Sequence, residues 1–103
     1  LLPVDGSFYP AGADIGPDGR LYVVERQFRG LGGFASRLRR FTFGAEGILP
    51  GETIFTSSPG RFGNLESVAV WQAPDGSLRA TMVSDDNFLD PRGTELVEIR
   101  LSN

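Results

Sequence analysis

Apolar and polar residues alternate along several short segments of this chain. In residues 36–43 and 94–101 the alternation has a period of two, as a strand with one buried face requires. Shorter apolar runs occupy residues 13–16, 21–27, 52–56, 65–72 and 78–85. The pattern predicts antiparallel strands with almost no helix, that is, an all-β fold. The expected buried positions are Val68, Val70, Met82, Leu96 and Ile99, with Trp71 in the core between two sheets.

Two segments are copies of one unit. Each contains Pro-Asp-Gly between two apolar runs, which is a strong hairpin signal. Pro17 and Pro74 lie 57 residues apart, and Leu38 and Leu96 lie 58 residues apart. A period near 50 residues is typical of propeller blades. We therefore predict antiparallel four-stranded blades of a β-propeller, about two in this chain, at residues 11–57 and 65–101 within one domain of residues 1–103.

Two blades cannot close a ring, because propellers have about four to eight. The chain is expected to be the carboxy-terminal part of a larger propeller. Its open edges would be covered by the remaining blades of the same propeller or by an oligomer.

Hairpin geometry predicts where the acidic residues meet. If Asp75 and Gly76 form a two-residue turn, Glu66 lies opposite Asp85 at the far end of the hairpin. The same rule places Asp14 opposite Val23 in the first unit, with Glu25 and Arg26 beyond it. Both units would then present acids at one edge, which in a propeller borders the mouth of the central channel.

Glu66, Asp85, Asp86 and Asn87 carry the hard oxygen ligands that calcium prefers. Adjacent carboxylates repel each other unless a cation or an arginine is near. The first interpretation is a metal site at these residues, with calcium as the candidate cofactor. The alternative is a turn capped by Asp86 and Asn87, with Asp85 paired to an arginine such as Arg37 or Arg92.

Glu25, Arg26 and Arg37 are candidate substrate-binding residues. An arginine held beside carboxylates recognises phosphate or carboxylate through two parallel hydrogen bonds. Two alternatives remain for them. Glu25 and Arg26 are also the charges expected at a solvated strand end, and Arg37, Arg39 and Arg40 are also compatible with a solvated strand face.

Composition excludes several classes of protein. The net charge is −3 and the pI about 4.8, so there is no footprint for nucleic acid. The chain has no Cys and no His, which excludes disulfides, zinc-thiolate sites and a Ser-His-Asp triad. A general base would have to be Asp, Glu or a metal-bound hydroxide. The sequence has neither an apolar run long enough to span a membrane nor a signal peptide.

An ordered set of motifs resembles one family of proteins. The set comprises residues 14–26, Ser36-Arg37-Leu38, Asn64-Leu65-Glu66, Ser84-Asp85-Asp86-Asn87-Phe88 and Thr94-Glu95-Leu96. In this order the motifs resemble the "esterase-like activity of phytase" family of β-propellers. The resemblance implies a propeller fold, hydrolysis of esters or phosphoesters, and a periplasmic or secreted location. Ser67 stands where the family usually has glycine, and the lysines and histidines that bind phytate in calcium-dependent phytases are absent from this chain.

Three functions follow from these observations. In the first, Glu66, Asp85 and Asp86 hold a calcium ion that positions water and a substrate phosphate, while Glu25 and Arg26 line the mouth. In the second, a non-catalytic propeller binds a small ligand, a glycan or a protein at the same mouth. In the third, the acids only cap turns.

Overall fold

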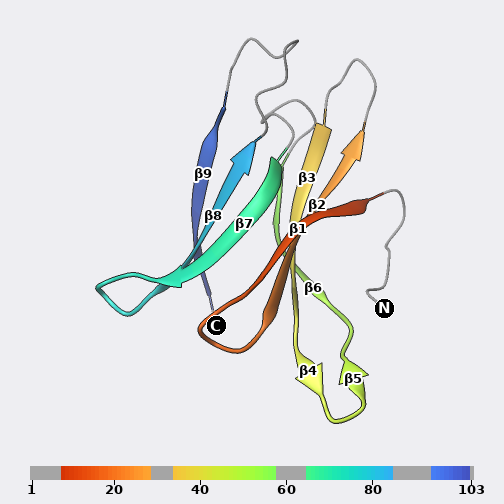
Figure 1. The fold of residues 1–103 in the computed structure, drawn as a ribbon, viewed down its shortest axis with the longest axis vertical. Coiled ribbons are helices and arrows are strands. Elements are labelled where there is room, and N and C mark those ends of the chain that lie inside the picture. Colours follow the sequence, from red (N-terminus) through yellow and green to blue (C-terminus); the bar gives the residue numbers. More distant parts are fainter. Residues whose placement is uncertain (1–7, 29–33, 58–64, 85–93, 103) are drawn as a thin grey trace.

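The computed structural model describes residues 8–28, 34–57, 65–84 and 94–102. These residues form a four-stranded sheet, a small two-stranded hairpin and a three-stranded sheet, all antiparallel (Figure 1). The strands are β1 (Tyr9–Ile15), β2 (Leu21–Phe28), β3 (Phe34–Phe41), β4 (Phe43–Gly44), β5 (Gly47–Ile48), β6 (Glu52–Thr56), β7 (Leu65–Gln72), β8 (Leu78–Ser84) and β9 (Leu96–Leu101). The described residues contain no helix, so the predicted all-β antiparallel class is confirmed.

The first sheet has the strand order β1-β2-β3-β6, and the second has the order β7-β8-β9. Each is an antiparallel sheet of neighbouring strands, as in a propeller blade. The hairpin β4-β5 was not predicted, because its strands have only two residues each. Alternation cannot be recognised over so short a length.

The two Asp-Gly turns have three residues in the loop, whereas the sequence predicts two. In the first turn, the amide of Gly16 donates to the carbonyl of Arg20, and Gly19 has a φ of 77°. In the second turn, Ala73 donates to Ser77, and Gly76 has a φ of 87°. A turn followed by a left-handed glycine is the usual three-residue hairpin loop. The extra residue moves the register by one.

The predicted cross-strand pairs are therefore wrong. Asp14 lies opposite Tyr22, and Ala13 lies opposite Val23. In the second sheet Leu65 lies opposite Ser84, and the register shifts between Leu65 and Ser67. Glu66 thus occupies a β-bulge, a feature that turns a side chain out of the regular alternation.

One hydrophobic core joins the two sheets. We call the face of each sheet that contributes to it the inner face and the opposite face the outer face. The core contains Tyr22, Val24 and Leu38 of the first sheet and Leu65, Val68, Val70, Ala80, Met82 and Leu101 of the second. Ile99 and Val97 pack against it and are partly buried. The predicted burial of Val68, Val70 and Met82 is confirmed.

The predictions for Leu96 and Trp71 are wrong. Leu96 is 71% exposed, and Trp71 is 38% exposed. In β9 the side chains of Val97, Ile99 and Leu101 point to the core, so Leu96 lies on the outer face. Trp71 also lies on the outer face, where its indole N–H donates to Thr81 Oγ1 at 2.9 Å. Two consecutive apolar residues, Leu96 and Val97, left the phase of the alternation ambiguous.

Edge strands β1 and β7 approach each other closely at the junction of the sheets. The amide of Val70 donates to Asp14 Oδ2 at 2.7 Å, so a side chain of the first sheet satisfies the backbone of the second. A Cβ added to Gly12 would lie 2.4 Å from the carbonyl oxygen of Glu66. Glycine at this position therefore permits the close approach of the two strands.

Candidate functional site

Glu25 forms the centre of a buried cluster of charges on the outer face of the first sheet. It comes from β2, and its neighbours in β3 are Arg37, directly opposite, and Arg39. Arg37 Nε donates to Glu25 Oε1 at 2.8 Å, and Arg39 Nη1 lies 3.8 Å from Glu25 Oε2. Glu25 is 1% exposed and Arg39 is 9% exposed. The alternative of a solvated strand face for the three arginines is therefore wrong.

Aromatic rings complete the surroundings of this cluster. The guanidinium carbon of Arg37 lies 4.1 Å from the centre of the Phe8 ring, and that of Arg39 lies 4.9 Å from the centre of the Phe41 ring. Weakly hydrated guanidinium groups stack favourably on such rings. Glu25 and Arg37, which the sequence predicted to bind substrate, are here engaged with each other in the body of the sheet.

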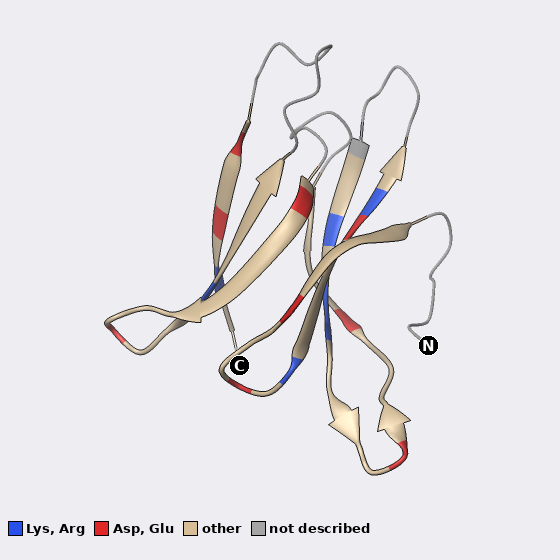
Figure 2. Cartoon of the chain, in the orientation of Figure 1, with Lys and Arg blue, Asp and Glu red and all other residues tan. Residues whose placement is uncertain are grey.

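Arg26 and Glu66 form a second ion pair, which connects the two sheets. Arg26 lies near the end of β2 on the same face as Tyr22 and Val24, and Glu66 lies in the bulge at the start of β7. Arg26 Nη1 and Glu66 Oε1 are 3.4 Å apart, and the two side chains are 39% and 42% exposed. Figure 2 shows acidic and basic positions together on the upper parts of the two sheets. Both groups remain accessible to a ligand.

The predicted metal ligands lie mostly outside the described residues. Of the four, only Glu66 is described, and Asp85, Asp86 and Asn87 fall within residues 85–93. Within the described part of the chain, no three His, Cys, Asp or Glu residues are close enough together to hold a metal ion. The calcium site remains a prediction, and the structure gives a different role to Glu66, which pairs with Arg26.

A polar network lies toward the opposite edge of the first sheet. The Tyr22 hydroxyl donates to Asp18 Oδ2 at 2.7 Å. Arg40 Nε donates to Glu52 Oε1 at 2.8 Å, and Arg40 Nη1 donates to the Ser102 carbonyl at 2.6 Å. Arg40 is 5% exposed. Its contact with Ser102 ties the first sheet to the residue that follows β9.

Burial and neighbours change the acidity of this network. Burial raises the pKa of Tyr22, and its hydrogen bond to Asp18 raises it further. The hydrogen bond from Arg40 lowers the pKa of Glu52 below its ordinary value. The raised pKa of Tyr22 favours a neutral phenol, and the lowered pKa of Glu52 favours an ionised carboxylate. These are the protonation states that the two hydrogen bonds require. The sequence pattern does not indicate that Arg40 and Glu52 form a pair, since β6 joins β3 across the intervening β4-β5 hairpin.

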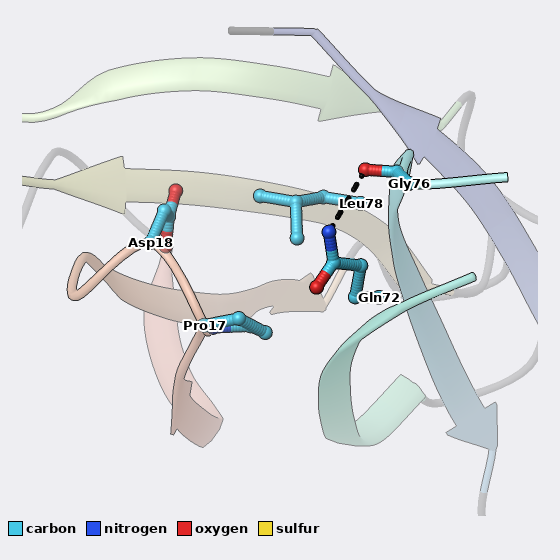
Figure 3. Close-up of a pocket in the computed structure, with 5 residues that line it drawn as sticks. All are labelled: Pro17, Asp18, Gln72, Gly76 and Leu78. Carbon is cyan, nitrogen blue, oxygen red and sulfur yellow. Dashed lines mark hydrogen bonds between the residues drawn. The ribbon is translucent and has the colours of Figure 1, made fainter. Parts of the chain in front are cut away.

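An open hollow lies between the two Asp-Gly turns. Figure 3 shows its lining by Pro17, Asp18, Gln72, Gly76 and Leu78. The side-chain amide of Gln72 donates through Nε2 to the Gly76 carbonyl at 3.2 Å. Asp18, the charged residue in this lining, already accepts hydrogen bonds from Tyr22 and from the Arg20 amide. The hollow therefore offers less to an anionic ligand than the edge that carries Arg26 and Glu66.

Comparison with known proteins identifies the family. The family model described as phytase-like, with esterase-like activity of phytase, matches residues 1–88. The chain belongs to this family. No curated protein and no solved structure gives a significant match. The match includes both Asp-Gly turns and the Arg26–Glu66 pair, and it agrees with the resemblance noted in the sequence. Among the described residues, no helix is long and apolar enough to cross a membrane.

Proposed function

We propose that this phytase-like propeller protein binds a ligand with an anionic ester group, such as a phosphate ester, at the edge that carries Arg26 and Glu66. The observation that supports this proposal is the accessible ion pair between the two sheets. A guanidinium group at such a junction can bind two oxygens of a phosphate or carboxylate at once. Glu66 positions this guanidinium, because it holds Nη1 from the neighbouring sheet.

The proposal assigns different roles to the predicted substrate-binding residues. Arg26 contacts the ligand. Glu25 and Arg37 do not contact the ligand. They stabilise the sheet, since Glu25 is buried and Arg37 Nε donates a hydrogen bond to it. A ligand that binds Arg26 competes with Glu66 for the guanidinium. Binding is therefore expected to weaken as salt is added, because both partners are exposed charges.

A calcium site at this edge would need ligands in addition to Glu66. The ion takes about six to eight oxygens, and the described part of the chain supplies Glu66 but no group of three His, Cys, Asp or Glu side chains close enough together to hold a metal ion. That donor set does not by itself fit calcium. Asp85, Asp86 and Asn87 remain the proposed additional ligands.

The second candidate function is hydrolysis of a phosphoester or another ester, assisted by calcium. The match to a family described by esterase-like activity favours it. Because the chain has no His and no Cys, the base for such a reaction would be Asp, Glu or a metal-bound hydroxide. A periplasmic or secreted location belongs to this proposal, and cell fractionation would test it.

Binding and hydrolysis can be measured with the same ligands. Calorimetry with phytate and with p-nitrophenyl phosphate would compare the wild type with Arg26→Gln. The loss of a charged hydrogen-bond donor should weaken binding about tenfold or more. Arg100→Gln is the matched control, because Arg100 is an exposed arginine on β9. Equal affinity of Arg26→Gln and the wild type would overturn the proposed site.

Hydrolysis is measured as the release of p-nitrophenol or phosphate, once in the presence of calcium and once in the presence of a chelator. Binding without product formation supports the non-catalytic function. Calcium-dependent product formation supports the hydrolase. If the wild type neither binds nor hydrolyses these compounds, both functions are rejected for phosphate esters.

A further inference from the structure

Two exposed aromatic side chains lie beside Arg26. Tyr9 of β1 is directly opposite Arg26 of β2, and Phe28 follows Arg26 by two positions in the same strand. Residues opposite each other in a sheet, and residues two apart in one strand, point to the same face. Tyr9 is 62% exposed and Phe28 is 69% exposed. Arg26 therefore has one accessible aromatic ring in the neighbouring strand and another further along its own strand.

These side chains belong to the inner face of the first sheet. Arg26 is two positions beyond Val24, a residue of the hydrophobic core, and so points to the same face. The residue before Tyr9 is Phe8, whose ring lies against Arg37 on the outer face, so Tyr9 points to the inner face. The two rings thus lie past the core residues of β2, at the edge where an ion pair joins the sheets.

The arrangement combines a cation with apolar ring surfaces. A guanidinium group binds two oxygens of a phosphate through parallel hydrogen bonds. An exposed aromatic side chain offers a flat face on which an aromatic ring of a ligand stacks. The Cβ atoms of opposite residues in a sheet are about 4.5 to 5.5 Å apart. A ring bonded to a phosphate that Arg26 holds is therefore within reach of Tyr9.

The second sheet has different residues at the corresponding positions. β2 and β8 both begin directly after an Asp-Gly turn, so residues at the same distance from the turn are equivalent, and Leu21 corresponds to Leu78. By this count Arg26 corresponds to Val83, which lies beside Ser67. An antiparallel sheet of this kind therefore forms without an arginine and an aromatic residue in this row. Strand pairing does not explain their presence in the first sheet.

We propose that the ligand of this edge is an aryl phosphate, that is, a phosphate ester in which an aromatic ring is bonded to the ester oxygen. The inference rests on the proposed function, because it keeps Arg26 as the group that binds the phosphate. Tyr9 and Phe28 contact the ring of the ligand. They make the site prefer aryl phosphates to alkyl phosphates, which carry the same charge but no ring.

Calorimetry with phenyl phosphate, cyclohexyl phosphate and methyl phosphate tests this preference, since the three compounds carry the same anionic group. The wild type should bind phenyl phosphate at least about tenfold more tightly than methyl phosphate, because of stacking on aromatic side chains. Tyr9→Leu and Phe28→Leu should each reduce this ratio about threefold, and the double variant should remove the preference. Phe43→Leu is the matched control, because Phe43 is an exposed aromatic residue of the β4-β5 hairpin, and it should keep the preference.

Proton NMR of phenyl phosphate gives a readout that needs no variant. Stacking should move the ring signals upfield when the compound binds to the wild type, and binding without such a shift would overturn the proposal. Leucine keeps an apolar side chain in place of each ring, and far-ultraviolet circular dichroism shows whether each variant is folded.

The aryl preference and the proposed function can fail separately. If Arg26→Gln loses affinity for phenyl and methyl phosphate but the wild type binds both equally, the aryl preference is overturned and the phosphate site stands. Equal binding of phenyl and cyclohexyl phosphate, or a preference that survives in the double variant, also overturns it. If Arg26→Gln binds these compounds as the wild type does, or the wild type binds none of them, the proposed function fails too.

Discussion

The two sheets share one strand register and fill equivalent positions in opposite ways. Where the first sheet has Glu25 and Arg37 on adjacent strands, the second has Met82 and Val97. Met82 is fully buried by apolar packing. Glu25 is also buried, but it depends on charged neighbours on its own sheet. The same strand arrangement thus accommodates a buried cluster of charges in one sheet and apolar packing in the other. The stability of the two should respond differently when one side chain is replaced.

Removal of the Glu25 charge should have the largest effect. Glu25→Gln leaves two guanidinium groups without their carboxylate, and the free energy of unfolding should fall by about 3 to 5 kcal/mol. Met82→Leu, a change of similar volume at the equivalent position, should cost less than about 1.5 kcal/mol. Urea unfolding measures both. A loss below about 1 kcal/mol for Glu25→Gln would show that the cluster is well solvated.

Transfer of the second sheet's residues tests whether charge or packing limits the stability of the first sheet. The triple variant Glu25→Met, Arg37→Val, Arg39→Ile gives the first sheet the apolar residues of the second. Replacement of a buried ion cluster by apolar residues is often neutral or stabilising by about 1 to 4 kcal/mol. The triple variant should therefore be far more stable than Glu25→Gln. If it is equally unstable, packing at this face, and not charge, limits stability.

Leu38 and Leu96 compare a leucine between the sheets with one on an outer face. Leu38 is fully buried, and Leu96 is 71% exposed. Leu38→Ala should cost about 2 to 5 kcal/mol because it leaves a cavity in the core. Leu96→Ala should change stability by no more than about 0.5 kcal/mol at low protein concentration. Thermal or urea unfolding measures the difference, and equal losses would contradict the assignment of inner and outer faces.

Asp14 and Trp71 also occupy equivalent positions, since Asp14 lies opposite Tyr22 and Trp71 lies opposite Arg79. Asp14 accepts a hydrogen bond from the other sheet, whereas Trp71 donates to Thr81 in its own sheet. Asp14→Ala should lower stability by about 1 to 3 kcal/mol, because the Val70 amide loses a charged acceptor. Asp14→Asn keeps an acceptor oxygen and should recover part of the loss. No difference between the two variants would argue against the hydrogen bond.

The ion pair of Arg40 with Glu52 should give the smallest effect, visible in its pH dependence. The hydrogen bond from Arg40 lowers the pKa of Glu52 from its ordinary 4.5. A depressed pKa in the folded state adds stability that is present above 4.5 and is lost as the pH falls through the lower folded value. The stability difference between the wild type and Glu52→Gln should therefore shrink on acidification below this range. A difference that is constant with pH would contradict the assignment.

The amino-acid sequence determined the local structure of this protein. Alternating residues predicted the strands to within a few residues, and the two Asp-Gly turns predicted both hairpins, because these signals depend on neighbours in the chain. The motifs also led to the family. Arg26 and Glu66 were both singled out from the sequence, although their contact was not.

The strand register, the buried face of each strand and the ion-pair partners depend on tertiary contacts. One additional loop residue in each turn shifted the cross-strand pairs next to the turn by one, and a β-bulge in each hairpin shifted the pairs beyond it by one more. The bulge at Glu66 turned that acid toward Arg26. Leu96 and Val97 are equally apolar, so only packing against the first sheet could show which one is buried. The arginines of β3 also read as solvated in sequence, yet two of them surround Glu25 and a third binds Glu52. These outcomes depend on contacts between residues far apart in the chain, and no local pattern records them.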